Sequence, residues 1–186
     1  ASTANHHYLK SNAFSRAVRH FQGLQFLFPT VSGVVLTDRV ERETTDRDPL
    51  PHLMWSRREI ENYLLVWPVV ERAFFAEASK STAWQGSNPG DLFAQTRSKE
   101  LRELMVSEFL VPAALQNPLH PDLLNKKGSD EVLAPFFTQA FERYGLENSL
   151  PKREFHRIAS QMRPEEIHSD VPAMLDRLAD ALTSTV

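Results

Sequence analysis

Apolar residues recur at helical spacing near the start of the chain. Phe14, Ala17 and Phe21 are separated by intervals of three and four residues, which place side chains on one face of a helix. The pattern predicts an amphipathic helix over residues 12–24. Gly23 lies close to its end, where helices commonly stop.

Two short runs after this helix have the composition of strands. Residues 33–38 (Gly-Val-Val-Leu-Thr-Asp) place β-branched and apolar side chains between a glycine and an acidic residue, which predicts a short buried strand. Residues 52–55 predict a second short strand. The charged segment 39–51 between them ends in Pro-Leu-Pro and is expected to be a loop.

A helix start signal follows the second strand. Ser56 and Glu59 fit a capping box, in which each side chain satisfies a backbone amide near the start of the helix. Ile60 begins the apolar face of this helix, and Pro68 stops or restarts it. A second apolar pattern then covers residues 69–80.

Apolar periodicity predicts four further helices in the rest of the chain, at residues 91–110, 129–144, 152–162 and 170–182. Together these patterns predict a helix-rich α/β fold. We expect an incomplete sheet layer within residues 1–80 and a helical subdomain in residues 81–186. Two or three strands make a poor complete sheet, so the sheet layer is expected to be partial.

Composition narrows the class of protein. The chain has 186 residues, of which 41% are hydrophobic and 24% charged, the ordinary mix of a globular protein. It has no cysteine, which excludes disulfide bonds, thiolate metal sites and a cysteine nucleophile. No apolar run approaches the ~18 residues that span a bilayer, and the first residues lack the apolar core of a signal peptide. We therefore expect a soluble cytoplasmic protein with no membrane partner.

Several kinds of site can be set aside. The net charge of −3 gives no global basic field for nucleic acid, although a local groove of Lys and Arg stays open. The glycines never give the spacing of a phosphate-binding loop, so we expect no ATP site in this chain. A His-Glu-x-x-His motif is also missing, and we interpret the histidines as surface or capping residues, notably His6, His7, His156 and His168.

The acidic residues offer better candidates. Asp38 ends the predicted strand, and an acidic residue in that position points into the crevice where open α/β sheets bind ligands. Its carboxylate suits a hard cation such as Mg²⁺, or it caps loop amides instead. Asp46 and Asp48 lie in the charged loop and are interpreted as solvated. Glu61 lies at the edge of the apolar face of the next helix, where capping and packing do not fully explain it.

Two segments together resemble a known family. Residues 33–38, the charged loop, and residues 55–65 (Trp-Ser-Arg-Arg-Glu-Ile-Glu-Asn-Tyr-Leu-Leu) resemble the Toprim region of OLD-type ATP-dependent endonucleases and related ABC-type ATPases. Residues 150–156 and 163–168 resemble the closing helical segment of the same proteins. The resemblance implies a partial Toprim-like sheet layer followed by a C-terminal helical subdomain. It also implies an ATPase module as partner, DNA as substrate, and homo-oligomers.

The resemblance assigns roles to individual residues. Toprim nucleases gather acidic residues around Mg²⁺ or Mn²⁺, and a lysine assists phosphodiester cleavage. Asp38 matches the first aspartate of the strand-end motif, Glu61 a further acidic residue, and Lys152 the lysine of the tail. The second aspartate of the motif is Val40 here, with Glu41 beside it as a substitute. The implied metal ligands are thus Asp38, Glu41 and Glu61.

The departures from the family pattern limit the expected activity. A glutamate that the family carries on its first strand has no counterpart before the first predicted helix. Together with Val40, this implies a chain that is inactive by itself. The competing hypothesis is a non-enzymatic helical module for dimerisation or partner docking. Its candidate interface residues are Phe74, Phe75, Trp84 and Phe93, although for each of them we favour core packing.

Overall fold

The computed structural model describes residues 5–9, 13–39, 50–82, 84 and 92–183. Two units emerge, and we name them for their place in the sequence. The terminal unit combines Ala1–Trp55 with Ser169–Val186, and the central unit is Ser56–His168. The division that we predicted between residues 80 and 81 does not coincide with either boundary of these units.

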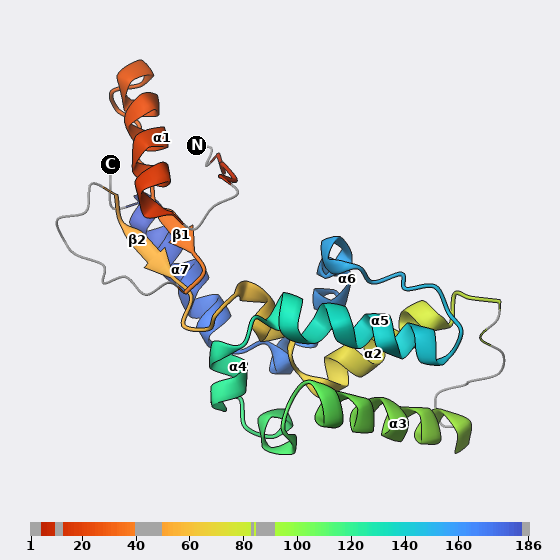
Figure 1. Cartoon of the computed structure of the whole chain (residues 1–186). Helices are drawn as coiled ribbons and strands as arrows, with labels where there is room; N and C mark the ends of the chain where they lie inside the picture. Colours follow the sequence, from red (N-terminus) through yellow and green to blue (C-terminus); the bar gives the residue numbers. More distant parts are fainter. Residues whose placement is uncertain (1–4, 10–12, 40–49, 83, 85–91, 184–186) are drawn as a thin grey trace. The chain divides into compact units, whose positions relative to one another are not determined.

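The terminal unit contains a parallel pair of short strands with one helix from each end of the chain (Figure 1). Its elements are α1 (Phe14–Leu27), β1 (Val35–Thr37), β2 (His52–Met54) and α7 (Asp170–Thr183). Leu36 pairs with Leu53 at the centre of the two-strand ladder. The predicted strands and the first and last predicted helices are therefore confirmed, but α1 does not end near Gly23, as we expected, and continues to Leu27.

The core of the terminal unit is small. Phe14 and Phe21 of α1 are buried with Leu50, as their helical spacing predicts. The ring of Phe14 also stacks on His52, with ring centroids 4.7 Å apart. His52 Nε2 lies 2.8 Å from Thr37 Oγ1, a side-chain hydrogen bond between β2 and β1. Phe14 of α1 and the His52–Thr37 pair thus add to the ladder in holding the strands, and α7 also contacts β2.

The central unit is almost entirely helical. Its three longer helices are α2 (Trp67–Ala78), α3 (Leu92–Glu108) and α5 (Ala134–Arg143). Shorter pieces connect them: η1 (Ile60–Leu64), η2 (Pro112–Leu115), α4 (Pro121–Asn125), a π-helical turn η3 (Gly128–Leu133), η4 (Lys152–Glu154), α6 (His156–Ala159) and η5 (Pro164–Glu166).

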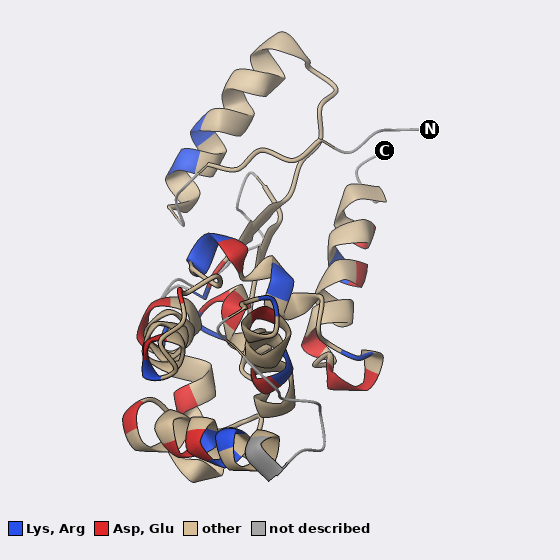
Figure 2. Cartoon of the chain, turned by 90° about the vertical axis from the view of Figure 1, so that its right-hand side faces the viewer, with Lys and Arg blue, Asp and Glu red and all other residues tan. Residues whose placement is uncertain are grey.

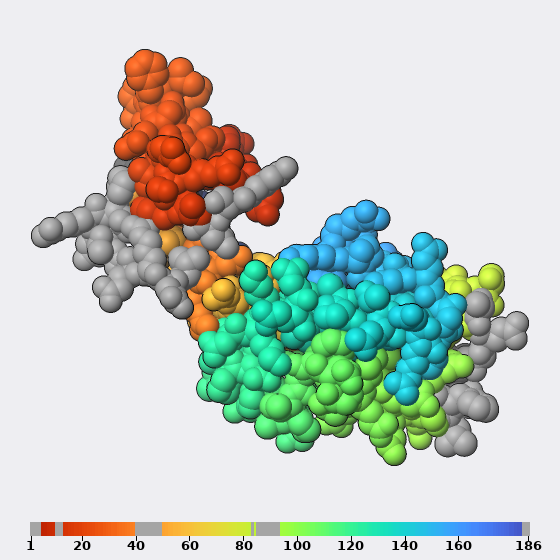
Figure 3. Space-filling view, in the orientation of Figure 1, coloured from red at the N-terminus to blue at the C-terminus, as the bar shows by residue number. Residues whose placement is uncertain are grey.

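Aromatic side chains fill the core of the central unit. Phe74 of α2 and Phe136, Phe137 and Phe141 of α5 are fully buried, and the rings of Phe74 and Phe141 lie 4.9 Å apart. Buried side chains of α3, including Leu101, complete the same cluster. Figure 3 shows α3 in green and α5 in teal lying side by side on one face. Each buried aromatic side chain contributes about 2–3 kcal/mol from apolar burial.

The region after the second strand departs from our prediction. We expected a helix capped by Ser56, but the first helical turn begins at Ile60 and its N-cap residue is Glu59. Glu59 and Asn62 form the reciprocal capping pair, and Ser56 Oγ instead lies 3.2 Å from Tyr63 Oη. Pro68 lies in the first turn of α2, where a proline needs no amide partner, and so restarts the helix.

Two further features bear on the sequence predictions. Gly145 follows α5 with a φ of 65°, the left-handed conformation in which glycine commonly ends helices. Among the described residues, no helix combines the length and apolar character needed to cross a membrane.

Candidate functional site

Asn62, within the segment that carries the family resemblance, forms the centre of a buried hydrogen-bond network. Its side chain is fully buried, and its amide nitrogen donates to the carbonyls of Leu123 and Lys126, both at 2.8 Å. Its Oδ1 accepts from the backbone amides of Glu59 and Gly128, both at 3.1 Å. Every hydrogen-bonding position of this amide is therefore used, as burial requires.

Arg57 and Glu59 extend the network on either side. The buried Arg57 guanidinium donates to the carbonyls of Asn62, at 2.8 Å, and Pro118, at 2.9 Å, and lies over the Tyr63 ring. Glu59 Oε2 accepts from the backbone amide and hydroxyl of Ser129, at 3.2 and 2.6 Å. These side chains hold the distant segment 118–129 against the start of the central unit.

Gly128 meets Asn62 at very short range. A Cβ on Gly128 would lie 2.9 Å from both the backbone nitrogen and Oδ1 of Asn62, closer than real Cβ atoms approach other atoms. The pair therefore requires glycine for close packing of two backbones. Asn62, one of the residues that carry the family resemblance, therefore has a structural role here.

Lys152 and Glu61 lie in one electrostatic neighbourhood of the central unit. Lys152 Nζ is 2.7 Å from Asp130 Oδ1, and both side chains are about half exposed, at 48% and 49%. Burial lowers the pKa of Lys152, but the hydrogen bond to Asp130 and the charges of Asp130, Glu59 and Glu61 raise it above its ordinary value. The pKa of Asp130 is correspondingly lowered, first of all by its hydrogen bond to Lys152. The Lys152 side chain is thus an ammonium group paired with Asp130, and its charge is favoured by two further carboxylates.

The other predicted metal ligands are placed differently. Asp38 comes directly after β1 at its carboxyl end, as predicted, and is partly buried in the terminal unit. Glu61 and Lys152 belong to the central unit, so neither unit alone contains all three. Glu41, Asp46 and Asp48 lie outside the described residues. Among the described residues, no group of three or more His, Asp or Glu side chains is arranged to hold a metal ion.

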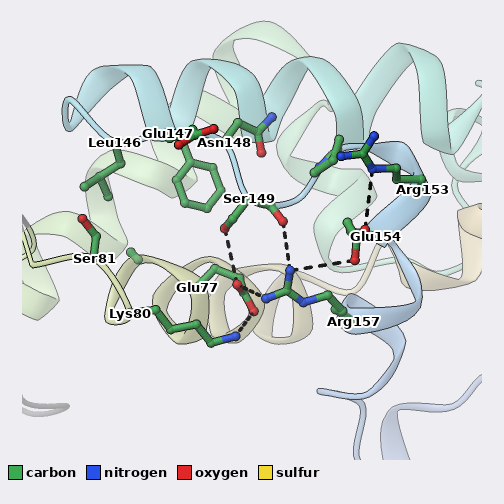
Figure 4. Close-up of a pocket in the computed structure, with 13 residues that line it drawn as sticks. Glu77, Lys80, Ser81, Leu146, Glu147, Asn148, Ser149, Arg153, Glu154 and Arg157 are labelled. Atoms are coloured by element: carbon green, nitrogen blue, oxygen red, sulfur yellow. Dashed lines mark hydrogen bonds and ion pairs between the residues drawn. The ribbon is translucent and has the colours of Figure 1, made fainter.

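Sequence reasoning missed a second charged cluster, which surrounds Glu77 of α2 (Figure 4). The Glu77 carboxylate is largely buried and pairs with Arg157, while Oε1 accepts from Lys80 Nζ at 2.6 Å. Arg157 also donates to the Ser149 carbonyl at 3.1 Å. A cavity of about 600 Å³ adjoins the cluster. The signal was present in the sequence, because Glu77 interrupts the apolar stripe of Ala73, Phe74 and Ala78.

Burial and charge act in opposite directions on Glu77. Burial raises the pKa of this carboxyl, but the hydrogen bonds and charges of Lys80 and Arg157 outweigh burial and leave the pKa below its ordinary value. Glu77 is therefore an ionised, satisfied group that ties α2 to α6 and to the segment before it. These contacts give the buried Glu77 carboxylate a structural role that needs no ligand.

The last segment that resembles the family, residues 163–168, is also attached to α2 by an ion pair. Arg72 of α2 pairs with both carboxylate oxygens of Glu166 and donates to the Gln161 carbonyl at 2.7 Å. The Arg72 hydrogen bond and the Arg163 backbone amide hold the pKa of Glu166 below its ordinary value, against a smaller effect of burial. Glu166 thus attaches this part of the tail to α2.

The candidate interface residues lie mostly in the core. Phe74 and Trp84 are buried, and Phe75 is partly buried against the same cluster. The Arg97 guanidinium lies over the Trp84 ring, 4.0 Å from the ring centroid, and so also covers a face of this ring. The side chain of Phe93 lies outside the described part of the chain. For Phe74 and Trp84, core packing is the interpretation that the structure confirms.

Comparison with known proteins gave no match: no family model, no curated protein and no solved structure matches the chain.

Proposed function

We propose that this chain is the C-terminal part of an ATPase-linked, metal-dependent nuclease of the Toprim type, and that it does not cleave DNA by itself. The observation that carries the proposal is the neighbourhood of Glu61 and Lys152. These residues come from the two separate segments that resemble the family: η1, which holds Glu61, packs against η3, and η3 packs against η4, which holds Lys152. Glu61 is the last and smallest of the charges that raise the pKa of Lys152, after Asp130 and Glu59. A protonated lysine beside carboxylates suits a site that handles a phosphodiester.

The donor atoms fit a metal site only in part. Asp38 and Glu61 offer the hard oxygen ligands that Mg²⁺ and Mn²⁺ prefer. Within the described residues, however, the carboxylates form no metal-holding group, and Asp130 is engaged by Lys152. Val40 also stands where the family has its second aspartate. We therefore derive no catalytic step through a metal and expect the chain alone to be inactive.

The first test is a nicking assay on supercoiled DNA with Mg²⁺ or Mn²⁺. We expect no cleavage by the wild-type chain above the level of Asp38→Ala. Robust cleavage that disappears in Asp38→Ala would overturn the proposed inactivity of the chain alone.

The second test measures binding of Mn²⁺ by the electron paramagnetic resonance signal of the free ion. We expect the wild-type chain to bind Mn²⁺ weakly. Asp38→Ala tests the contribution of the terminal unit and Glu61→Gln, separately, that of the central unit, and each substitution should lower the amount of Mn²⁺ bound. Asp176→Ala on α7 and Glu108→Gln on α3 change exposed carboxylates by the same chemistry and should bind as the wild type does. Binding that no variant weakens, or no binding at all, would favour the non-enzymatic helical module instead.

A further inference from the structure

Two histidine side chains of the terminal unit lie against each other. His7 is exposed in the segment of residues 5–9, and His20 is a partly buried residue of α1. Their ring centroids are 4.9 Å apart, and the ring planes are tilted by 50°. The contact therefore joins the first described segment of the chain to α1, whose apolar face packs in the core of the unit.

One ring nitrogen of this pair is buried without a hydrogen bond. It is Nε2 of His20, which no donor or acceptor of the described residues reaches. Leaving a buried polar atom unpaired costs free energy, and such an atom in a folded protein is commonly satisfied by water or by an ion. His20 Nε2 therefore marks a position where a bound species would supply the missing partner.

The spacing of the two rings fits two imidazoles bound to one metal ion. A histidine nitrogen lies about 2.0–2.1 Å from Zn²⁺, and the ring centre lies about 1.1 Å farther along the same line. At an angle of about 90–110° at the metal, two such ring centres are roughly 4.5–5.2 Å apart. The observed 4.9 Å falls within this range, and the tilt of 50° shows that the rings are not stacked face to face.

The surroundings of the pair favour a metal that prefers nitrogen ligands. Helix α1 contains no Asp or Glu, and Figure 2 shows only Lys and Arg colouring on it. The first acidic residue of the sequence is Asp38. Among the described residues, no third His, Asp or Glu forms a metal-holding group with the two histidines. Two imidazoles without a carboxylate suit Zn²⁺, Cu²⁺ or Ni²⁺ better than the hard cation Mg²⁺.

We propose that His7 and His20 bind a divalent transition metal such as Zn²⁺, with water in the remaining coordination positions. Nε2 is the ligand atom on His20, where the metal supplies the partner that the protein does not. His7 lies on an exposed segment, so its ring can turn to admit the ion. The bound metal fastens residues 5–9 to α1. This site uses neither Asp38 nor Glu61 and does not depend on the proposed nuclease function.

The test is isothermal titration calorimetry with Zn²⁺ on the full chain, after metal has been removed with EDTA and dialysis. We expect His7→Gln and His20→Gln each to weaken binding at least tenfold, because losing a group that merely supports a ligand already costs about 10–100-fold. The matched controls are His6→Gln in the same segment and His156→Gln at an exposed position of α6, which should bind within twofold of the wild type. Circular dichroism should show every variant folded.

Hydrogen–deuterium exchange gives a second measurement. Zn²⁺ should slow exchange of the α1 backbone amides in the wild type and in His6→Gln, but not in His7→Gln, because the metal ties residues 5–9 to the helix. Equal loss of binding in a control variant, binding that survives in His7→Gln, or no Zn²⁺ binding would overturn the proposal. Mn²⁺ ranks lowest in affinity for nitrogen sites, so His7→Gln should leave Mn²⁺ binding unchanged, and either proposal can fail alone.

Discussion

Asn62 joins three segments of the central unit through one buried amide. Its four hydrogen bonds reach Glu59, Leu123, Lys126 and Gly128. The residue lies within the stretch that resembles Toprim nucleases, yet these four hydrogen bonds of its side chain are all with backbone atoms of the fold. At the scale of single residues, such a stretch can therefore reflect packing as well as chemistry, and the two can be separated by substitution.

Asn62→Asp should lower the free energy of unfolding by about 2–4 kcal/mol. The substitution turns two donated hydrogen bonds into contacts between a carboxylate oxygen and the carbonyls of Leu123 and Lys126. Urea unfolding followed by circular dichroism measures the change. Asn117→Asp is the matched control, because exposed Asn117 uses only its Oδ1 acceptor, toward the Leu119 amide, and aspartate keeps it. An unchanged stability in Asn62→Asp would contradict the buried network.

Gly128→Ala and Gly23→Ala should change stability in opposite directions. At Gly128 the added Cβ meets the Asn62 backbone at 2.9–3.0 Å, so we expect a loss of about 2 kcal/mol or more. At Gly23, inside α1, nothing lies within 4 Å, so alanine should stabilise the helix by about 0.5–1 kcal/mol. Thermal unfolding of both variants measures the contrast. Similar effects from both would show that the Gly128 contact is not tight.

At the scale of elements, the central unit uses charged clamps to fasten its C-terminal segments to α2. Glu77 binds Lys80 and Arg157, and Arg72 binds Glu166. A carboxyl group whose pKa is lower in the folded state stabilises fully above its unfolded pKa, and that contribution is lost as pH falls through the folded value. Glu77 is such a group, with an ordinary value of 4.5.

Glu77→Gln should therefore be less stable than the wild type by about 1–3 kcal/mol near neutral pH, where Lys80 and Arg157 lose their charged partner. The difference between the two proteins should shrink as pH falls below the ordinary glutamate value, because the wild-type carboxyl becomes protonated. Urea unfolding across acidic pH measures it. Glu108→Gln, at an exposed position of α3, should show neither effect. A difference that stays constant with pH would show that Glu77 does not act through its charge.

The elements differ in how far the sequence predicts them. Helix α1 and strand β1 were predictable because Phe14, Phe21 and the run 33–38 follow local patterns. The start of the central unit was not, because three of the four hydrogen-bond partners of the Asn62 side chain lie more than sixty residues away along the chain. The grouping of Glu61 with Lys152 followed from family resemblance rather than from any spacing. The ion pairs of Glu77 with Lys80 and Arg157 were not predicted, although an acidic residue within an apolar stripe indicated a buried charge at this position.

At the scale of the whole molecule, the boundary that we predicted at residue 80 would cut through a packed core. It separates Phe74 from Phe141, whose rings are 4.9 Å apart, and Glu77 from Arg157. Composition changes along a sequence do not reveal such contacts, because they do not show which distant residue each side chain meets. The structure instead places the first and last segments of the chain in one unit and the intervening residues in another.

Because the central unit is a continuous segment with its own core, residues 56–168 should fold as an independent protein. The core includes Phe74, Phe137 and Phe141, all buried within that segment, and the clamps of Arg72 and Glu77 also close inside it. By contrast, the principal core cluster of the terminal unit rests on Phe14, Phe21 and Leu50. Small cores of this kind give little stability by themselves.

We expect residues 56–168 alone to show a helical circular dichroism spectrum, a near-ultraviolet signal from packed aromatic rings, and one cooperative urea transition. Asn62→Asp should lower the transition midpoint in this shorter protein as it does in the full chain, because all partners of Asn62 are retained. A matched control is the segment 81–168, which lacks α2 and should fail to fold. A shorter protein of residues 56–168 with a broad transition and no near-ultraviolet signal would mean that its core depends on the terminal segments.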